Sequence, residues 1–233
     1  MLRIRDGLTL FLMGLLSQAG IGLAVETGAQ VKGIVSFRGI VPLAETMQVT
    51  ADAELCGKEV RIQPVQVNAE TLGLRHVVVS IKDVPSLMAG PVPKRLIENT
   101  GCAFVPRVGA ALLGDFLEIY NRDSFLHNTH IKVGKKTFLN VAQVAGSRPI
   151  MKTLKRVGLH DIRCDKHTFM AGSLQVFAHP YFAVTDELGA FQLPPLPPGS
   201  YTLVVWHETL GSLEQEITVP SQGTVTIKIE YPS

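Results

Sequence analysis

The chain has 233 residues, a formal net charge of +2 and 46% hydrophobic residues. This length suits one large domain, or one β-sandwich with a small appendage, and the small net charge gives no sign of a nucleic-acid partner. The 14 prolines and 21 glycines are spread along the chain and interrupt short apolar runs, which favours strands over a helical bundle.

Residues 1–24 have the pattern of a secretory signal peptide. Arg3 and Arg5 supply the positive start, an apolar stretch runs from Leu8 to Leu23, and small residues suit cleavage after Ala24. The alternative is an uncleaved membrane anchor, although the interrupted stretch is short for a span. We therefore expect an exported, periplasmic protein that meets a membrane only if this signal is retained.

The next part of the chain contains three strand patterns. Val31–Arg38 alternates weakly, Val60–Val67 is a second candidate, and His76–Ile81 has the continuous valine run of a strand buried on both faces. Residues 85–101 are rich in proline and glycine and predict a long connection, with one helical turn around Lys94–Glu98.

Strand patterns are denser in the second half, and the last one alternates most clearly between apolar and polar residues. Together they predict an all-β fold. The strands expected here are Phe116–Tyr120, Leu159–Cys164, a strand through Leu174 and Val176, Tyr201–Trp206 and Val225–Tyr231.

Three cysteines in an exported protein leave one without a partner. Two would normally pair in an oxidising compartment, and the remaining thiol needs another role. Cys56 and Cys102 have unremarkable neighbours, whereas Cys164 begins the sequence Cys-Asp-Lys-His-Thr-Phe-Met. The simplest arrangement is a Cys56–Cys102 disulfide, with Cys164 as a metal-binding thiolate.

That sequence places Cys164, His167 and Met170 within seven residues, in a loop that follows a predicted strand. Soft sulfur ligands select copper, and two histidines with one cysteine and a weak methionine form an electron-transfer copper site. Zinc would be expected to recruit four Cys, His or carboxylate ligands, for which methionine is a poor substitute, and covalent haem would need a Cys-x-x-Cys-His run, which the sequence lacks. A second histidine must come from elsewhere, and His127 and His130 are the candidates. They lie three apart in an extended segment, so only one of them should face the metal.

Residues 103–177 resemble the cupredoxins, the family of plastocyanin, azurin and amicyanin. The match rests on the strand that ends in Asn-Arg at 121–122, the His-Asn-x-His turn at 127–130, and the short Cys-x-x-His-x-x-Met loop. The resemblance implies a Greek-key β-sandwich with one type 1 copper. It also implies that His127 is the ligand in preference to His130, and that Asn128 links the two ligand loops and donates to the thiolate.

A second resemblance covers the C-terminal part, which is similar to the carboxypeptidase regulatory-like domain, a small non-catalytic transthyretin-like sandwich. We expect a signal peptide at 1–24, a copper domain at 25–180 and this module at 181–233. About 50 residues are too few to bury a full core, so the module should pack on the copper domain or complete its sheet with Val31–Arg38. The residues that carry the match are Asp186, Gly189, Phe191, Pro197, Pro198, Gly199, Tyr201 and Leu203.

The resemblance and the loop together predict a carrier of single electrons between proteins. An enzyme is not expected, because four protein ligands leave no open position for a substrate. The alternatives are a periplasmic copper carrier or resistance protein, and a non-redox scaffold with a vestigial site. His179 and His207 could be further ligands, but we favour hydrogen bonding between domains for both.

Residues 131–170 carry nine basic side chains and only two acidic ones. The structural explanation of such a run is a solvated face. The functional explanation is that it steers an acidic redox partner toward the copper edge, with Lys135 and Lys136 among the residues that do so.

Overall fold

The computed structural model describes residues 28–85 and 94–232, so the expected signal peptide lies outside the described part of the chain. This part forms 18 strands and one helical turn, which confirms the predicted all-β class, and it contains no helix long and apolar enough to cross a membrane. The elements are β1 (Gln30–Phe37), β2 (Glu45–Gln48), α1 (Ala53–Cys56), β3 (Glu59–Ile62), β4 (Val78–Ile81), β5 (Lys94–Thr100), β6 (Ala103–Val105), β7 (Val108–Leu112), β8 (Phe116–Asn121), β9 (His127–Val133), β10 (Lys136–Gln143), β11 (Ile150–Thr153), β12 (Gly158–Arg163), β13 (Ala171–Phe177), β14 (Phe182–Val184), β15 (Ala190–Gln192), β16 (Gly199–His207), β17 (Gly211–Val219) and β18 (Thr224–Tyr231).

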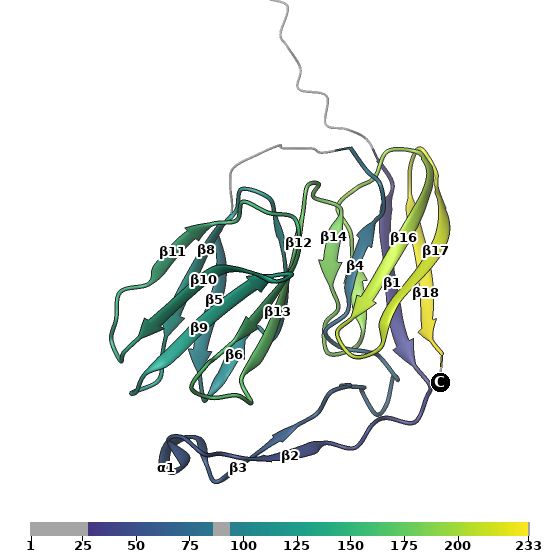
Figure 1. Cartoon of the computed structure of the whole chain (residues 1–233). Helices are drawn as coiled ribbons and strands as arrows, with labels where there is room; N and C mark the ends of the chain where they lie inside the picture. The colour runs from purple at the N-terminus through teal and green to yellow at the C-terminus, as the bar shows by residue number, and fades with distance from the viewer. Residues whose placement is uncertain (1–27, 86–93, 233) are drawn as a thin grey trace, which may run out of the picture.

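Two β-units lie side by side in Figure 1, each with its own hydrophobic core. The central unit contains β5 to β13, arranged as a five-stranded sheet (β10-β9-β12-β13-β7) and a four-stranded sheet (β11-β8-β5-β6). Alternate side chains of the facing strands point inward, which buries Leu117, Ile119 and Ile162 almost completely. The predicted β-sandwich is therefore confirmed.

The terminal unit contains β1, β4 and β14 to β18, in the orders β15-β1-β18 and β14-β4-β16-β17. Strand β1 pairs in parallel with β18 along its whole length and antiparallel with β15. The expected division at residue 180 therefore does not follow the packing, because β1 and β4 come from the range assigned to the copper domain. They pack here because Val35 of β1 and Val79 of β4 are buried in the same core cluster as residues of the later strands, such as Val205 and Ile227.

One expected connection contains a strand. Residues 94–100 form β5, which pairs in parallel with β8, and no helical turn occurs there. Ile97 and Asn99 are the buried positions of this strand, and the Asn99 amide donates to the Tyr120 carbonyl and the Thr129 hydroxyl. A buried asparagine breaks the apolar alternation that would have indicated a strand.

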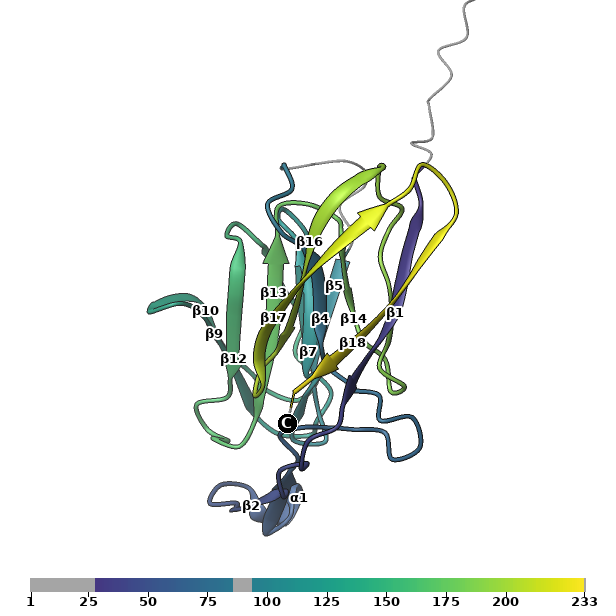
Figure 2. The same ribbon diagram turned by 90° about the vertical axis from the view of Figure 1, so that its right-hand side faces the viewer.

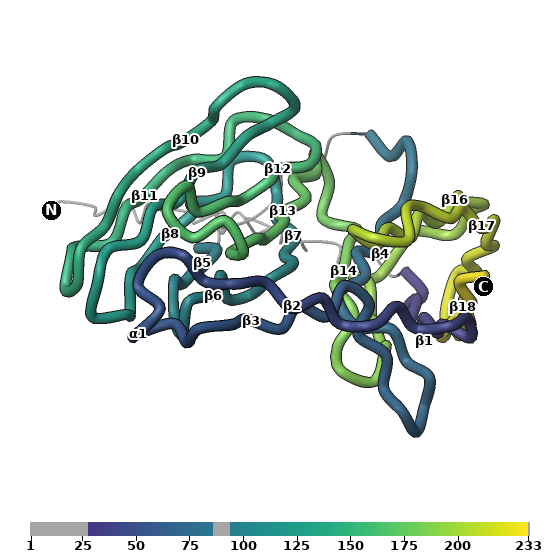
Figure 3. Tube along the Cα trace, turned by 60° about the horizontal axis from the view of Figure 1, so that its bottom comes forward, coloured from purple at the N-terminus to yellow at the C-terminus, as the bar shows by residue number. Residues whose placement is uncertain are grey.

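A long segment, residues 38–66, leaves the terminal unit and extends beneath the central unit (Figures 1 and 3); we call it the arm. It contains the β2–β3 hairpin and α1, so only the first part of the predicted strand Val60–Val67 is regular. A disulfide between Cys56 and Cys102 attaches the arm to the turn between β5 and β6. Figure 2 shows α1 and β2 below both units, at the end where β9 begins.

The two units also meet through charged side chains. Arg107, just before β7, donates from its Nε atom to Glu208 Oε1 over 2.7 Å, and Ser173 contacts the other oxygen of Glu208. Strands β14 and β4 lie against β7 at this junction. The central unit is therefore held from one side by the terminal unit and from below by the arm.

Candidate metal centre

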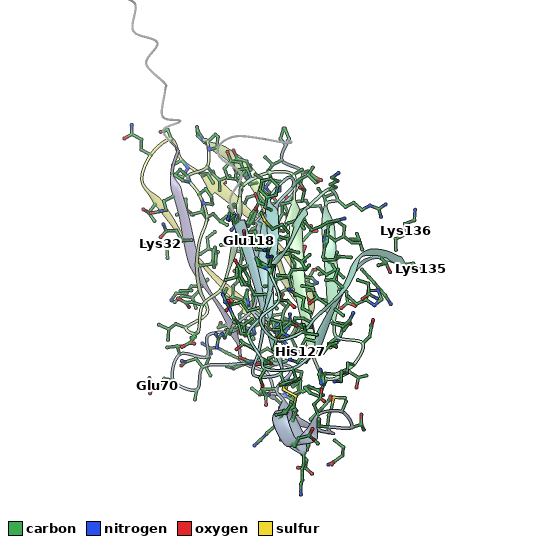
Figure 4. All side chains as sticks on the ribbon, turned by 90° about the vertical axis from the view of Figure 1, so that its left-hand side faces the viewer. Lys32, Glu70, Glu118, His127, Lys135 and Lys136 are labelled. Atoms are coloured by element: carbon green, nitrogen blue, oxygen red, sulfur yellow. A yellow bond between two sulfur atoms is a disulfide. The ribbon has the colours of Figure 1, made fainter. Side chains whose placement is uncertain are left out.

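The sheet brings the predicted ligands to one end of the central unit. Strands β9 and β12 are antiparallel neighbours, so His127 at the start of β9 lies beside the end of β12. Cys164 follows β12 directly, and His167 and Met170 belong to the loop that leads into β13. Figure 4 shows His127 at the lower end of the unit, next to the arm.

Three of the predicted donors converge within this end. His127 Nδ1 is 3.1 Å from His167 Nδ1, and Cys164 Sγ is 3.6 Å from the same His167 nitrogen. Candidate ligand atoms of these residues all lie within 4.8 Å of one another. Their exposed fractions are 1% for both histidines and 2% for Cys164, so the donors are withdrawn from water.

Met170 closes the loop and is 1% exposed. The Cys164 backbone N–H donates to the Met170 carbonyl over 3.3 Å, and the Met170 N–H donates to the His167 carbonyl over 2.8 Å. These bonds hold the seven residues in one compact turn. The Met170 side chain is buried in the same hydrophobic cluster as Cys164, so its thioether lies in the apolar interior around the site.

The orientation of each imidazole is fixed from outside by a carboxylate. His127 Nε2 is 2.7 Å from Asp123 Oδ2, and His167 Nε2 is 2.9 Å from Asp52 Oδ2. A carboxylate only accepts hydrogen bonds, so each Nε2 carries the proton, and each Nδ1 of a neutral ring presents a bare lone pair to the centre. Burial lowers the pKa of His127, with Asp123 acting in the opposite direction, and this favours the neutral ring that metal binding requires.

Sequence reasoning missed both of these carboxylates. Asp123 precedes His127 by four residues, so an acid close to a predicted ligand was an available signal. It is held in place by the backbone N–H groups of Gly101 and Cys102. Asp52 is 115 residues from His167 and carries no local signal. Cys102 also lies near Asp123 and His127, but its sulfur is in the disulfide and is not a thiolate.

Asn128 bridges the two loops of the site. Its backbone N–H donates to Cys164 Sγ over 3.4 Å, and its side-chain oxygen accepts from the Asp165 N–H over 2.7 Å. Two aromatic rings enclose the histidines: the Phe125 centroid is 4.8 Å from that of His127, and the Phe169 centroid is 5.8 Å from that of His167. The donors therefore sit in a water-poor surrounding in which the two ligand loops are joined by hydrogen bonds.

The three other histidines that the sequence offered as possible ligands, His130, His179 and His207, lie elsewhere. His130 is on the other face of β9, where its ring contacts Asp165 and Thr137. His179 Nδ1 accepts from the Tyr181 N–H, and His207 Nδ1 accepts from the Thr209 N–H, both within or beside the terminal unit. The structure thus keeps all three histidines out of the convergent group.

The basic stretch does not surround the metal centre. Lys135 and Lys136 lie at the turn between β9 and β10, at the opposite end of β9 from His127 (Figure 4). Of the basic residues in this stretch, Lys166 is the one bonded at the site, where Nζ is 2.6 Å from Asp52 Oδ2. The hairpin carries Lys135 and Lys136 about seven residues along an extended strand, roughly 20 Å from His127, so any steering by these two residues would act away from the metal edge.

No family model and no curated protein matches this sequence. Among solved structures, a reduced amicyanin variant is 20% identical with a TM-score of 0.32, and the match covers 35% of this chain and 80% of that one. A purple cupredoxin from Nitrosopumilus maritimus is 18% identical with a TM-score of 0.31, covering 35% of this chain and 98% of the cupredoxin. A copper-containing nitrite reductase from Thermus scotoductus is 21% identical with a TM-score of 0.34, covering 42% of this chain but only 25% of the reductase. Since these matches span less than half of the chain at low identity, its function has to be inferred from the side chains at the site.

Proposed function

We propose that this protein binds one copper ion through His127, Cys164, His167 and Met170 and carries single electrons. One observation supports this most strongly. The Nδ1 atoms of two buried imidazoles lie 3.1 Å apart, while both Nε2 atoms are within hydrogen-bond distance of carboxylates. With both rings neutral and protonated at Nε2, the two Nδ1 lone pairs face and repel each other, and Cys164 Sγ lies 3.6 Å from the His167 nitrogen. A cation among the three donors removes this repulsion.

The donor set favours copper over other cations. A thiolate and a thioether are soft ligands, and the combination with two imidazoles suits a copper electron-transfer centre. Zinc would be expected to take a fourth Cys, His or carboxylate ligand, for which the Met170 thioether is a poor substitute. Hard cations would use carboxylates, but the carboxylates here bind the outer nitrogens of the histidines. The acidic groups thus act behind the ligands and orient them.

The surroundings of the site support electron transfer in preference to catalysis on a substrate. Bound copper would supply a one-electron couple. Asn128 links the two ligand loops, and the aromatic rings of Phe125 and Phe169 exclude water, so the donors need to move little between charge states. Four protein donors leave no open position for a substrate.

Export is part of the proposal. The signal pattern at residues 1–24 and a disulfide between Cys56 and Cys102 are both typical of an oxidising compartment such as the periplasm. Electrons would pass to and from a redox partner protein there. The positive charge of residues 131–170 favours an acidic partner. Lys135 and Lys136 lie too far from the metal edge to contact a partner that docks there.

The terminal unit is proposed to be a non-catalytic module of the carboxypeptidase regulatory-like type. Residues that carry the resemblance make structural contacts in it. Asp186 Oδ1 accepts from the backbone N–H groups of Leu188 and Ala190, and Gly189 between them has a φ of 75°. The Tyr201 hydroxyl donates to the Pro197 carbonyl. These contacts shape turns within the unit, which is consistent with a structural and non-catalytic role.

Copper titration of the purified protein tests the proposal. We expect one Cu(II) per chain and an intense blue thiolate-to-copper absorption. Cys164→Ser and His127→Asn should abolish this absorption, whereas His130→Asn, the matched control on the outer face of β9, should keep it. A colourless protein that retains Cu(I) would instead indicate a copper carrier, and a protein that binds no copper would indicate a scaffold; either result contradicts the electron-carrier proposal.

A further inference from the structure

The arm places a carboxylate directly behind one of the proposed ligands. Asp52 Oδ2 is 2.9 Å from His167 Nε2 and 2.6 Å from Lys166 Nζ. The His167 side chain is 0% exposed, whereas 19% of the Asp52 side chain is exposed. Asp52 therefore lies between the buried imidazole and the solvent. It belongs to the arm, whereas all four proposed ligands belong to the central β-sandwich.

The position of the arm does not depend on Asp52. Val49 is buried in the central core, and Met47, Val60 and Ile62 pack against it. The Cys56–Cys102 disulfide adds a covalent attachment four residues after Asp52. Replacing the Asp52 side chain should therefore leave the arm in place, so that changes at the metal centre report on the carboxylate itself.

The local backbone makes this carboxylate available to His167. Asp52 has φ 54° and ψ 38°, a left-handed conformation that few residues other than glycine, asparagine and aspartate adopt readily. It occupies the position before α1, where an aspartate side chain commonly caps the helix, but it makes no such cap. Its carboxylate instead points to His167 and Lys166.

We propose that Asp52 is a positioning residue of the metal centre, which holds the His167 ring with Nδ1 directed inward and stabilises the more highly charged state of the bound metal. This inference rests on the proposed copper function. A negative charge beside a ligand attracts Cu(II) more strongly than Cu(I), and partial burial limits screening by water. Asp52 should therefore lower the reduction potential and slow the loss of Cu(II). Lys166 lies on the same carboxylate and should act in the opposite direction.

Three variants separate charge from shape. Asp52→Asn keeps an acceptor and tolerates the left-handed backbone but removes the charge, and Asp52→Gly removes the side chain at a position where glycine is unstrained. Lys166→Gln removes the opposing charge. Glu54→Gln is the matched control, because Glu54 is an exposed carboxylate on the same arm.

We expect Asp52→Asn to weaken Cu(II) binding about tenfold, in line with the loss of outer partners at other metal sites. If Cu(I) binding is unchanged, the potential rises by about 59 mV, the value of a tenfold change for one electron. Lys166→Gln should shift the potential downward, and Glu54→Gln should leave it unchanged. Asp52→Gly should also release Cu(II) faster to a chelator, because the His167 ring is no longer held.

The metal-free protein provides an independent readout. Ring-nitrogen NMR should show the Nε2–H tautomer of His167 in the unmodified chain and a mixture of tautomers in Asp52→Gly. Unchanged potentials in Asp52→Asn and Lys166→Gln would overturn the charge effect while leaving the blue absorption and the copper function intact. Absence of blue absorption in the unmodified protein would instead contradict the proposed function. In that case an unchanged His167 tautomer in Asp52→Gly would overturn the positioning role as well.

Discussion

Removal of the Cys56–Cys102 disulfide should destabilise the chain strongly, because the unfolded chain gains the conformational freedom that the cross-link denies it. The two cysteines are 46 residues apart, so the disulfide closes a long loop in the unfolded chain. In the chain-entropy model a loop of this size corresponds to about 4 kcal/mol at 25 °C. With a urea m-value of about 2.5 kcal/mol per M, the unfolding midpoint should fall by roughly 1.6 M.

The perturbation is the double variant Cys56→Ser with Cys102→Ser, compared with the unmodified pair. Both proteins should carry Cys164→Ser, since a free thiol could otherwise exchange with the disulfide. Urea unfolding of the metal-free proteins gives the free-energy difference. A difference below about 1 kcal/mol would refute the reasoning, because it would mean that the arm is already restrained in the unfolded chain or contributes little once released.

Three further outcomes are expected. Met170→Leu should keep the blue absorption and raise the reduction potential, measured by redox titration, because a weak donor to Cu(II) is lost. Burial lowers the pKa of His76 from 6.5 to about 4, so the unfolded chain takes up a proton first as the pH falls. The free energy of unfolding should therefore be roughly 1 kcal/mol lower at pH 5 than at pH 7, after discounting for partial exposure, and His76→Asn should flatten this dependence in urea titrations at the two pH values. Reversing Lys135 and Lys136 to glutamate should leave electron exchange unchanged at physiological salt, since a Debye length of about 8 Å is far shorter than their distance from the site. A clear drop in that rate would mean that the partner docks on the β9–β10 turn.

Much of the proposed ligand set could be predicted from the sequence because it is local. Cys164, His167 and Met170 lie in one short loop, and the donor types alone indicate soft-metal chemistry. Strand periodicity also indicated that His127 and His130 point to opposite faces, and in the structure only His127 turns toward Cys164. The all-β class was predictable for the same reason, since alternation along a strand depends on neighbouring residues.

Features that depend on distant partners were not predictable in this way. Strand β5 was missed because its buried Asn99 is satisfied by groups on β8 and β9, which no local pattern reveals. Completion of the C-terminal sheet by Val31–Arg38 was one of two sequence-based expectations, but its parallel pairing with β18, which joins the two ends of the described chain, was decided by tertiary packing. Asp52 reaches His167 across 115 residues only because the arm folds beneath the central unit. Periodicity shows which face of an element is buried, whereas the surface it meets is decided by the free energy of packing the whole chain.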